Sequence, residues 1–292
     1  MLVKDLRKKF KSKILSKGVV LPGAYNALTA MQIEQTGFEG AYISGAALSA
    51  SAGLPDIGLL TLSEFSFFIK YITHAVKIPC IADCDTGFGD VINVSRSVKE
   101  MESIGLCGIH IEDQIMPKRC GHLEGKKLIS SGDMIQKIQA ACLSRKDDNF
   151  LIIARTDARS VDGIDEAIHR AQLYVEAGAD AIFPEALKSK EEFELFAKKL
   201  NVPLLANMTE FGVSPLLNTE ELLSMGYKII IYPVTALRVS MKITKSLLED
   251  IKTNGSQLEY LKKMQTRNEL YDLLNYNSYA ELDSKVANYK IK

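Results

Sequence analysis

The 292-residue sequence has no excess charge of either sign, because 36 basic residues balance 36 acidic ones. Proteins that mainly bind nucleic acid or an anionic membrane need a positive surplus, so the balance argues against both partners. No apolar run reaches the roughly 20 residues of a transmembrane helix, and we expect a soluble protein. The five cysteines are odd in number and include no C-x-x-C zinc pattern. They are typical of reduced thiols in a cytoplasmic protein, and any one of them can be reactive.

Residues 1–17 form a basic segment with seven Lys or Arg and a single acid. The apolar positions recur at helical spacing: Val3, Leu6, Phe10 and Ile14. This period predicts an amphipathic helix. It can be a surface helix that docks on the domain, or a targeting helix, since transit peptides are also amphipathic and poor in acids. The lysine-rich composition, with no small-residue cleavage site after it, favours the surface helix.

Short β-type runs alternate with helical patterns along residues 18–233. The strand candidates are 18–23, 40–45, 78–85, 107–113, 150–157, 180–185, 202–208 and 228–233. The amphipathic helical segments between them are 26–36, 62–76, 91–103, 132–145, 164–177, 189–199 and 219–225. Apolar strands that alternate with helices indicate a parallel sheet, and eight such units predict an α/β fold, a (β/α)8 barrel of the TIM type. A doubly wound open sheet is the alternative, but no G-x-G-x-x-G follows the first strand.

Residues 234–292 follow the last predicted strand as a long, mostly helical segment. No linker rich in proline or glycine precedes it, so we predict an extension of the same domain rather than a second one. The expected organisation is therefore a helix over 1–17, a barrel core over 18–233 and a helical C-terminal extension over 234–292.

Polar side chains gather at the carboxyl ends of the predicted strands. They are Tyr42, Ser44, Asp83, Asp85, His110, Glu112, Asp113, Arg155, Asp157, Glu185, Asn207, Thr209 and Tyr232. In a barrel of this kind the βα loops build the active site at that end. A single Asp there is more often a helix N-cap than a ligand, but the pattern recurs on seven of the eight strands and favours a site.

Two carboxylates, Asp83 and Asp85, lie two positions apart on one predicted strand, so their side chains leave the same face. Two like charges this close need a cation or a shared proton. Asp56, in a loop after the second strand, and Glu112, after the fourth, can add further oxygens. Oxygen ligands without a His–Cys cluster are those that Mg²⁺ or Mn²⁺ prefers. The alternative is that the pair caps the next helix or binds Arg155.

The segment M-P-K-R-C-G-H places a thiol among cations. Cys120 is flanked by Lys118, Arg119 and His122, and a positive field lowers the pKa of a thiol. Two nearby glycines suggest a mobile loop of the kind that closes over substrates. A basic surface loop with an incidental cysteine fits the local sequence equally well.

Three arginines are candidates for binding carboxylates, because guanidinium pairs with them bidentately. Arg155 follows the apolar run L-I-I-A, where an unpaired cation would be costly. Arg238 and Arg267 lie beyond the last predicted strand, and without further evidence solvated helix residues are the better interpretation of both.

Six motifs together resemble the isocitrate lyase/phosphoenolpyruvate mutase superfamily. They are IEDQxxxKRCGH (111–122), DxDTGFG (83–89), ARTDA (154–158), IFPEA (182–186), ANMTEFG (206–212) and MQTRxELY (264–271). The resemblance extends from about residue 18 to residue 280, and it is greatest to the branch that cleaves 2-methylisocitrate. It implies magnesium-dependent retro-aldol (Claisen-type) cleavage of this tricarboxylate into pyruvate and succinate, a step of propionate breakdown in the methylcitrate cycle. It also implies a homo-oligomer, commonly a tetramer, whose C-terminal arm packs on a neighbouring subunit.

The resemblance also implies roles for individual residues. The catalytic group is Cys120 as general acid, with Tyr42, Lys118 and His122. The metal group is Asp83 and Asp85, with Asp56 and Glu112 acting through waters. The substrate-binding group is Ser44, Gly45, Ala46, Cys120, Gly121, Arg155, Glu185, Asn207, Met208, Thr209, Arg238 and Arg267. The base that removes the hydroxyl proton is open between Tyr42, Asp56 and a water on the metal. Two departures stand out: Leu123 and Glu124 replace the frequent Arg-Pro after CGH, and SGAA replaces SGAG.

The substrate methyl group is expected to contact Phe183, Ile231 and Pro233. Glu185 faces the site, so Phe183, two residues earlier, points into the barrel as well; interior barrel packing is the alternative for all three.

Other superfamily activities stay open, namely isocitrate lyase, oxaloacetate decarboxylase or hydrolase, and phosphonopyruvate-type mutase. Cys120 counts against the last two groups, and the short chain counts against isocitrate lyase. A barrel that serves only as a catalytically inactive scaffold would have lost the site residues, whereas this sequence retains them.

Overall fold

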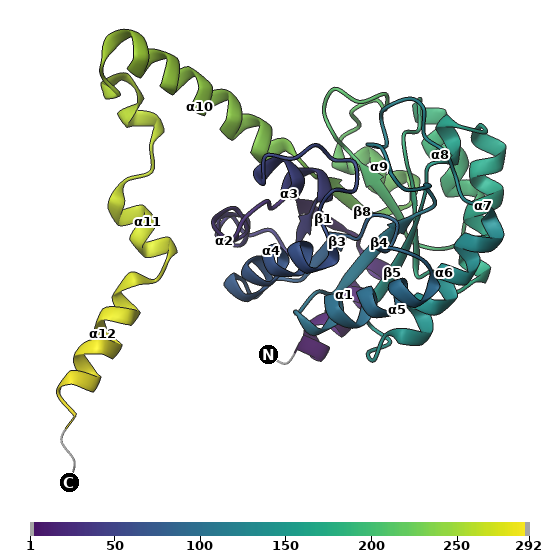
Figure 1. The fold of residues 1–292 in the computed structure, drawn as a ribbon, viewed down its shortest axis with the longest axis horizontal. Helices are drawn as coiled ribbons and strands as arrows, with labels where there is room; N and C mark the ends of the chain where they lie inside the picture. Colours follow the sequence, from purple (N-terminus) through teal and green to yellow (C-terminus); the bar gives the residue numbers. More distant parts are fainter. Residues whose placement is uncertain (1–2, 290–292) are drawn as a thin grey trace. The chain divides into compact units, whose positions relative to one another are not determined.

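A parallel sheet of eight strands forms the centre of the molecule, whose computed structural model describes residues 3–289. The strands are β1 (Val19–Pro22), β2 (Ala41–Ile43), β3 (Cys80–Asp83), β4 (Gly108–Glu112), β5 (Leu151–Thr156), β6 (Ala181–Pro184), β7 (Leu204–Asn207) and β8 (Tyr227–Tyr232). Their order is β1-β8-β7-β6-β5-β4-β3-β2, and a parallel bridge between Gly23 and Tyr42 joins β1 to β2. The sheet is thus a nearly closed barrel (Figure 1). The TIM-type prediction is confirmed, and the open-sheet alternative is wrong.

Helices surround the barrel (Figure 1). They are α2 (Ala27–Gln35), α4 (Leu62–Ala75), α5 (Val91–Ser103), α6 (Ser131–Ser144), α7 (Ile164–Glu176), α8 (Lys190–Lys199) and α9 (Thr219–Met225). Each of them agrees with its predicted range to within one residue at either end. The sequence patterns did not predict α3 (Gly45–Ser51) or the short 3-10 helix η1 (Ala158–Ser160). Ser44 caps α3, because its Oγ accepts a hydrogen bond from the Ala47 N–H at 3.4 Å.

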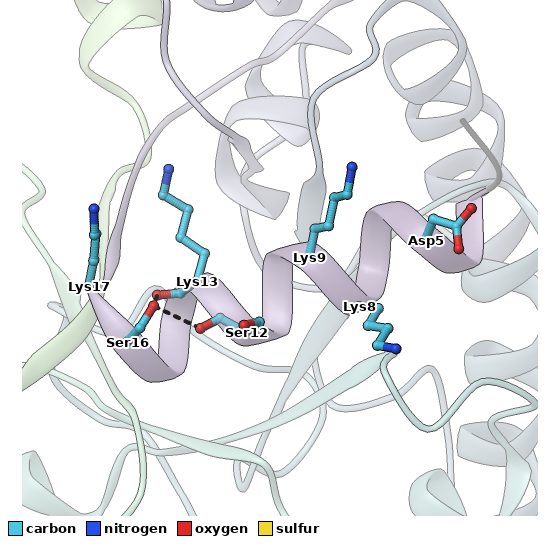
Figure 2. Close-up of a pocket in the computed structure, with 7 residues that line it drawn as sticks. All are labelled: Asp5, Lys8, Lys9, Ser12, Lys13, Ser16 and Lys17. Carbon is cyan, nitrogen blue, oxygen red and sulfur yellow. Dashed lines mark hydrogen bonds between the residues drawn. The ribbon is translucent and has the colours of Figure 1, made fainter.

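The predicted basic helix forms as α1 (Val3–Ser16), which docks at the amino end of the barrel. Phe10 and Ile14 pack with the apolar side chains inside the barrel. The Arg7 guanidinium is buried and donates to the backbone carbonyls of Leu106 and Glu102 at 2.8 and 2.6 Å. Figure 2 shows Lys8, Lys9 and Lys13 of α1, which line a shallow pocket together with Lys17. One end of the barrel is therefore closed by α1, and the βα loops surround the other.

The chain divides into two compact units, Met1–Leu237 and Arg238–Lys292. The second unit holds most of α10 (Thr235–Asn254), then η2 (Leu258–Lys263), α11 (Arg267–Leu273) and α12 (Tyr276–Ala287). Its three α-helices bury none of their residues. Across residues 3–289, no helix combines the length and the apolar character that a membrane crossing requires.

Candidate active site

The carboxylates predicted to bind a metal lie around the ammonium group of Lys118. Its Nζ lies 2.5 Å from Asp56 Oδ1 and 2.7 Å from Asp85 Oδ1, and the side chain is only 2% exposed. Burial opposes the charge of Lys118. The neighbouring carboxylates, with Glu112 and Asp85 foremost, outweigh burial and raise the pKa of Lys118 well above 10.5.

Asp83 and Asp85 come together for a reason that differs from the predicted one. β3 ends at Asp83, and Asp85 has a left-handed φ of 44°, so strand alternation does not relate the two. Instead, the Asp85 N–H donates to Asp83 Oδ1 at 3.0 Å. The Gly45 N–H also donates to Asp83, at 3.3 Å. The predicted shared strand face is wrong, but both carboxyl groups lie near Lys118.

The pKa values of two acids of the site stay raised despite the cations beside them, and this fits a divalent cation. Glu112 is fully buried, and within the described chain neither of its carboxyl oxygens has a hydrogen-bond partner. Burial outweighs the effect of Arg155 and raises the pKa of Glu112 well above 4.5. Burial, helped by Asp83, raises the pKa of Asp85 to about 6 despite the nearby Lys118 charge. Extra positive charge would relieve both groups.

The arrangement suits a cation that keeps several waters. Among residues 3–289, no three His, Cys, Asp or Glu side chains converge closely enough to enclose a metal ion. Mg²⁺ commonly binds through one or two carboxylates and retains water on its other positions. Asp83 and Asp85, with the carboxyl group of Glu112 nearby, match that donor set.

The segment that carries Cys120 is a loop between β4 and α6, closed at its base by backbone pairing. The Ile115 N–H donates to Lys127 O at 2.8 Å. The Gln114 side chain donates to Arg119 O at 2.8 Å and accepts from Arg119 N at 2.9 Å. A Cβ on Gly121 would lie 2.4 Å from Glu185 Cγ and 2.5 Å from Arg155 Nη2. The loop backbone thus lies directly against Arg155 and Glu185, where only glycine fits.

The prediction of a lowered thiol pKa at Cys120 is wrong. Burial, with a contribution from Glu185, raises the pKa of this thiol above 9.0. The flanking basic residues have other partners: Lys118 pairs with carboxylates, Arg119 donates to Glu124 O at 3.0 Å, and His122 Nε2 lies 2.9 Å from Glu185 Oε1. Cys120 is free and partly buried, and at neutral pH it carries its proton, as a proton donor requires.

Arg155 lies at the centre of a buried network of acids. Its guanidinium pairs with Asp157 at 2.9 Å, Glu112 at 3.2 Å and Glu185 at 3.4 Å. Its Cζ also lies 5.2 Å from the centre of the Phe183 ring. Burial alone would raise the pKa of Glu185, but Arg155 and His122 outweigh it and hold this pKa well below its usual range. Both partners are therefore charged at neutral pH.

Tyr42 and His110 form a second buried pair beside Asp83. The Tyr42 hydroxyl lies 2.7 Å from His110 Nε2, and His110 Nδ1 lies 3.7 Å from Asp83 Oδ1. Burial lowers the pKa of His110 to about 4, so the imidazole is neutral. Burial, helped by Asp83, raises the pKa of Tyr42 well above 10.0. The phenol accordingly keeps its proton at neutral pH.

The structure places the remaining predicted residues in different surroundings. Asn207 Nδ2 donates to Glu185 Oε2 at 3.3 Å, and the Thr209 N–H donates to Asn207 Oδ1 at 3.1 Å. The Met208 side chain packs in the outer core between strands and helices. Ser44, Gly45 and Ala46 form the start of α3 rather than an open loop.

The predicted methyl pocket is partly inside the barrel. Phe183 and Ile231 are buried among its interior side chains, whereas Pro233 is buried one residue beyond the end of β8. Arg238 and Arg267 belong to the second unit, on α10 and at the first residue of α11. The substrate-binding roles of these residues stay predictions.

Sequence reasoning missed Lys126 and Gln114, which both fix the Cys120 loop. Lys126 is buried whereas its neighbour Lys127 is exposed. Its ammonium group donates to Gly121 O and, at 2.9 Å, to Asp157 Oδ1. Nothing in the local sequence separates the two lysines, because the partner of Lys126 comes from another strand end.

The comparisons with known proteins agree with this geometry. The family model of phosphoenolpyruvate phosphomutase matches residues 10–252. A 2-methylisocitrate lyase of Aeropyrum pernix is 53% identical over 92% of this chain and 87% of its own. A 2-methylisocitrate lyase of Bacillus subtilis is 45% identical over 91% of this chain and 88% of its own.

Solved structures of related enzymes share the fold. A 2,3-dimethylmalate lyase, described as a member of the PEP mutase/isocitrate lyase superfamily, has a TM-score of 0.90 at 32% identity over 96% of this chain and 95% of its own. Oxaloacetate acetylhydrolase, in complex with 3,3-difluorooxalacetate, reaches 0.92 at 32% identity over 99% of both chains. Phosphonopyruvate hydrolase, in complex with oxalate and Mg²⁺, has a TM-score of 0.87 at 30% identity over 96% of this chain and 98% of its own. With the matched family model and these relatives, the chain belongs to the phosphoenolpyruvate mutase/isocitrate lyase family.

Proposed function

We propose that this enzyme cleaves 2-methylisocitrate into pyruvate and succinate. The observation that carries the proposal is a protonated Cys120 thiol in a loop that lies against Arg155 and Glu185. The relatives that are 45% and 53% identical are named for this activity. The reaction is a retro-aldol cleavage and would serve propionate breakdown through the methylcitrate cycle in the cytoplasm.

A divalent cation, Mg²⁺ or alternatively Mn²⁺, is part of the proposal. Asp83 and Asp85 would hold it, and Asp56 and Glu112 would reach it through waters. When bound, such a cation lowers the pKa of the substrate hydroxyl and stabilises charge on the pyruvate half. The raised pKa of Asp85 and the buried oxygens of Glu112, which have no hydrogen-bond partner within the described chain, support this assignment.

Different residues of the chain would carry out the two proton transfers of the reaction. The buried Tyr42 phenol keeps its proton because its pKa is raised well above 10.0, which leaves Asp56 or a water on the cation to remove the hydroxyl proton. Cleavage leaves the succinate half as a doubly charged aci-carboxylate, which cationic and neutral donors must stabilise. Arg155 and the amide of Asn207 are such donors. The Cys120 thiol delivers the proton to carbon.

We also propose that the enzyme is a homo-oligomer, most simply a tetramer. α10 buries none of its residues and exposes Val239, Met241, Ile243, Leu248 and Ile251. Exposed apolar faces of this extent favour burial against a neighbouring subunit. Size-exclusion chromatography with light scattering should give the mass of four chains. A monomer at micromolar concentration would contradict the proposal.

A coupled assay tests the function. Purified protein with Mg²⁺ receives 2-methylisocitrate or isocitrate, and lactate dehydrogenase reports pyruvate while phenylhydrazine reports glyoxylate. We expect equal amounts of pyruvate and succinate from 2-methylisocitrate and much slower glyoxylate release from isocitrate. Oxaloacetate and phosphonopyruvate are assayed in parallel. Faster turnover of isocitrate, oxaloacetate or phosphonopyruvate than of 2-methylisocitrate would overturn the proposal.

A further inference from the structure

Two neighbouring lysines in the Cys120 loop have opposite surroundings. The side chain of Lys126 is 1% exposed, whereas Lys127 is exposed. A buried ammonium group is stable only where acceptors match its charge and its donors. Lys126 meets this condition with two acceptors, Gly121 O and Asp157 Oδ1. The first belongs to the residue after Cys120, and the second belongs to the barrel.

The path of the loop explains how one side chain reaches both acceptors. The backbone turns at Gly125, whose φ of 78° is left-handed, so Lys126 returns alongside Gly121. Asp157 directly follows β5, and its N–H donates to Asp113 Oδ1 at 2.9 Å. The Asp157 carboxylate is therefore a fixed point of the barrel. Lys126 connects the part of the loop that follows Cys120 to this point.

Asp157 also holds Arg155. The Arg155 Nε donates to Asp157 Oδ2 at 2.9 Å and Nη2 donates to Asp157 Oδ1 at 3.1 Å. The same Oδ1 accepts from Lys126 at 2.9 Å. A continuous path of charge-assisted hydrogen bonds thus runs from the Gly121 carbonyl to the guanidinium. Such bonds are stronger than neutral ones and fix geometry.

We propose that Lys126 is a positioning residue that holds the Cys120 loop over Arg155 and links the position of the loop to the guanidinium through Asp157. We call Gly121, Lys126 and Asp157 the Lys126 bridge. The inference rests on the proposed function, in which Cys120 is the proton donor. Gln114 holds the peptide group before Cys120 through Arg119 O, and the Lys126 bridge holds the chain after Cys120 through Gly121 O.

The test compares Lys126→Met with Lys127→Met, which removes the same charge from an exposed position one residue away. Iodoacetamide labels the enzyme without substrate, and peptide mass mapping gives the rate at each cysteine. We expect Cys120 to react roughly 10- to 100-fold faster in Lys126→Met, the range that corresponds to losing a charged hydrogen bond. Loss of a nearby cation would by itself raise the thiol pKa and slow labelling, so a faster rate reports an opened loop.

The other cysteines and the kinetics separate positioning from a general loss of structure. Cys80, Cys84 and Cys107 are buried and should stay unreactive, and Lys127→Met should match the native enzyme. In Lys126→Met, kcat for 2-methylisocitrate should fall by a similar factor, while KM changes far less. The reason is that Arg155 keeps its contacts to Glu112 and Glu185.

A second variant keeps the test decisive if Lys126→Met does not fold. Lys126→Gln retains a donor for Gly121 O but lacks the charge, and we expect a smaller, still selective increase at Cys120. Unchanged labelling in a folded Lys126 variant would overturn the inference, as would equal acceleration at every cysteine with a lowered melting temperature. Labelling needs no substrate, so an enzyme inactive on 2-methylisocitrate with a selective increase at Cys120 would refute the function and retain the bridge.

Discussion

A serine at position 120 tests the proton-donor role directly. Burial raises the pKa of the Cys120 thiol, so at pH 7 the thiol holds its proton. Serine keeps the shape of the side chain but is a far weaker acid. General acid catalysis contributes about 10²- to 10⁴-fold, and we expect Cys120→Ser to lose that factor in kcat. The loss corresponds to about 3–5 kcal/mol of transition-state stabilisation at roughly 1.4 kcal/mol per tenfold change.

The pH dependence has a definite sign. Only the protonated thiol can donate, and burial raises its pKa, so kcat should hold through neutral pH and fall only at alkaline pH. Alkylation by iodoacetamide requires the thiolate and should follow the opposite course, rising about tenfold per pH unit between pH 7 and 9. Stopped-flow pyruvate release gives kcat, and mass mapping gives the labelling rate. Substrate affinity should change little in the serine variant, because Arg155 and Glu185 are untouched.

Three results would refute this reasoning. A labelling rate that levels off below pH 8 would show a thiolate at neutral pH. A covalent substrate adduct on Cys120 would make the residue a nucleophile instead of an acid. Full activity of Cys120→Ser would remove the thiol from the reaction.

Three further predictions follow from other parts of the structure. Chelation of divalent cations should abolish turnover, and added Mg²⁺ should restore it. An Asp85→Ala variant that keeps full activity in the presence of the chelator would contradict a cation site. The native enzyme should prefer 2-methylisocitrate over isocitrate by roughly 10- to 200-fold in kcat/KM. Phe183→Trp should erase that ratio by filling the methyl pocket; full selectivity would contradict the assignment. Phe10→Ala should lower the free energy of unfolding by about 3–5 kcal/mol in urea titrations, and an unchanged midpoint would exclude α1 from the core.

The sequence alone was sufficient for the barrel and for the end that holds the site. Strand and helix periods are local properties of the chain, and eight successive βα units without G-x-G-x-x-G after the first strand favour a closed barrel over an open sheet. The strand-end residues Asp83, Glu112, Arg155 and Glu185 follow from that periodicity, because parallel strands bring their carboxyl ends together. The motif around Cys120 is equally local.

Charge states and loop contacts depended on the tertiary structure. The flanking residues of Cys120 predicted a lowered pKa, but burial reversed the sign and the cations found partners elsewhere. Lys126 and Lys127 are alike in sequence, and only the fold brings Asp157 to one of them. A pKa depends on solvent exclusion and on charges that arrive from distant segments. Sequence therefore determined which groups are present at the site, and the fold determined which of them carry protons and which hold the loop.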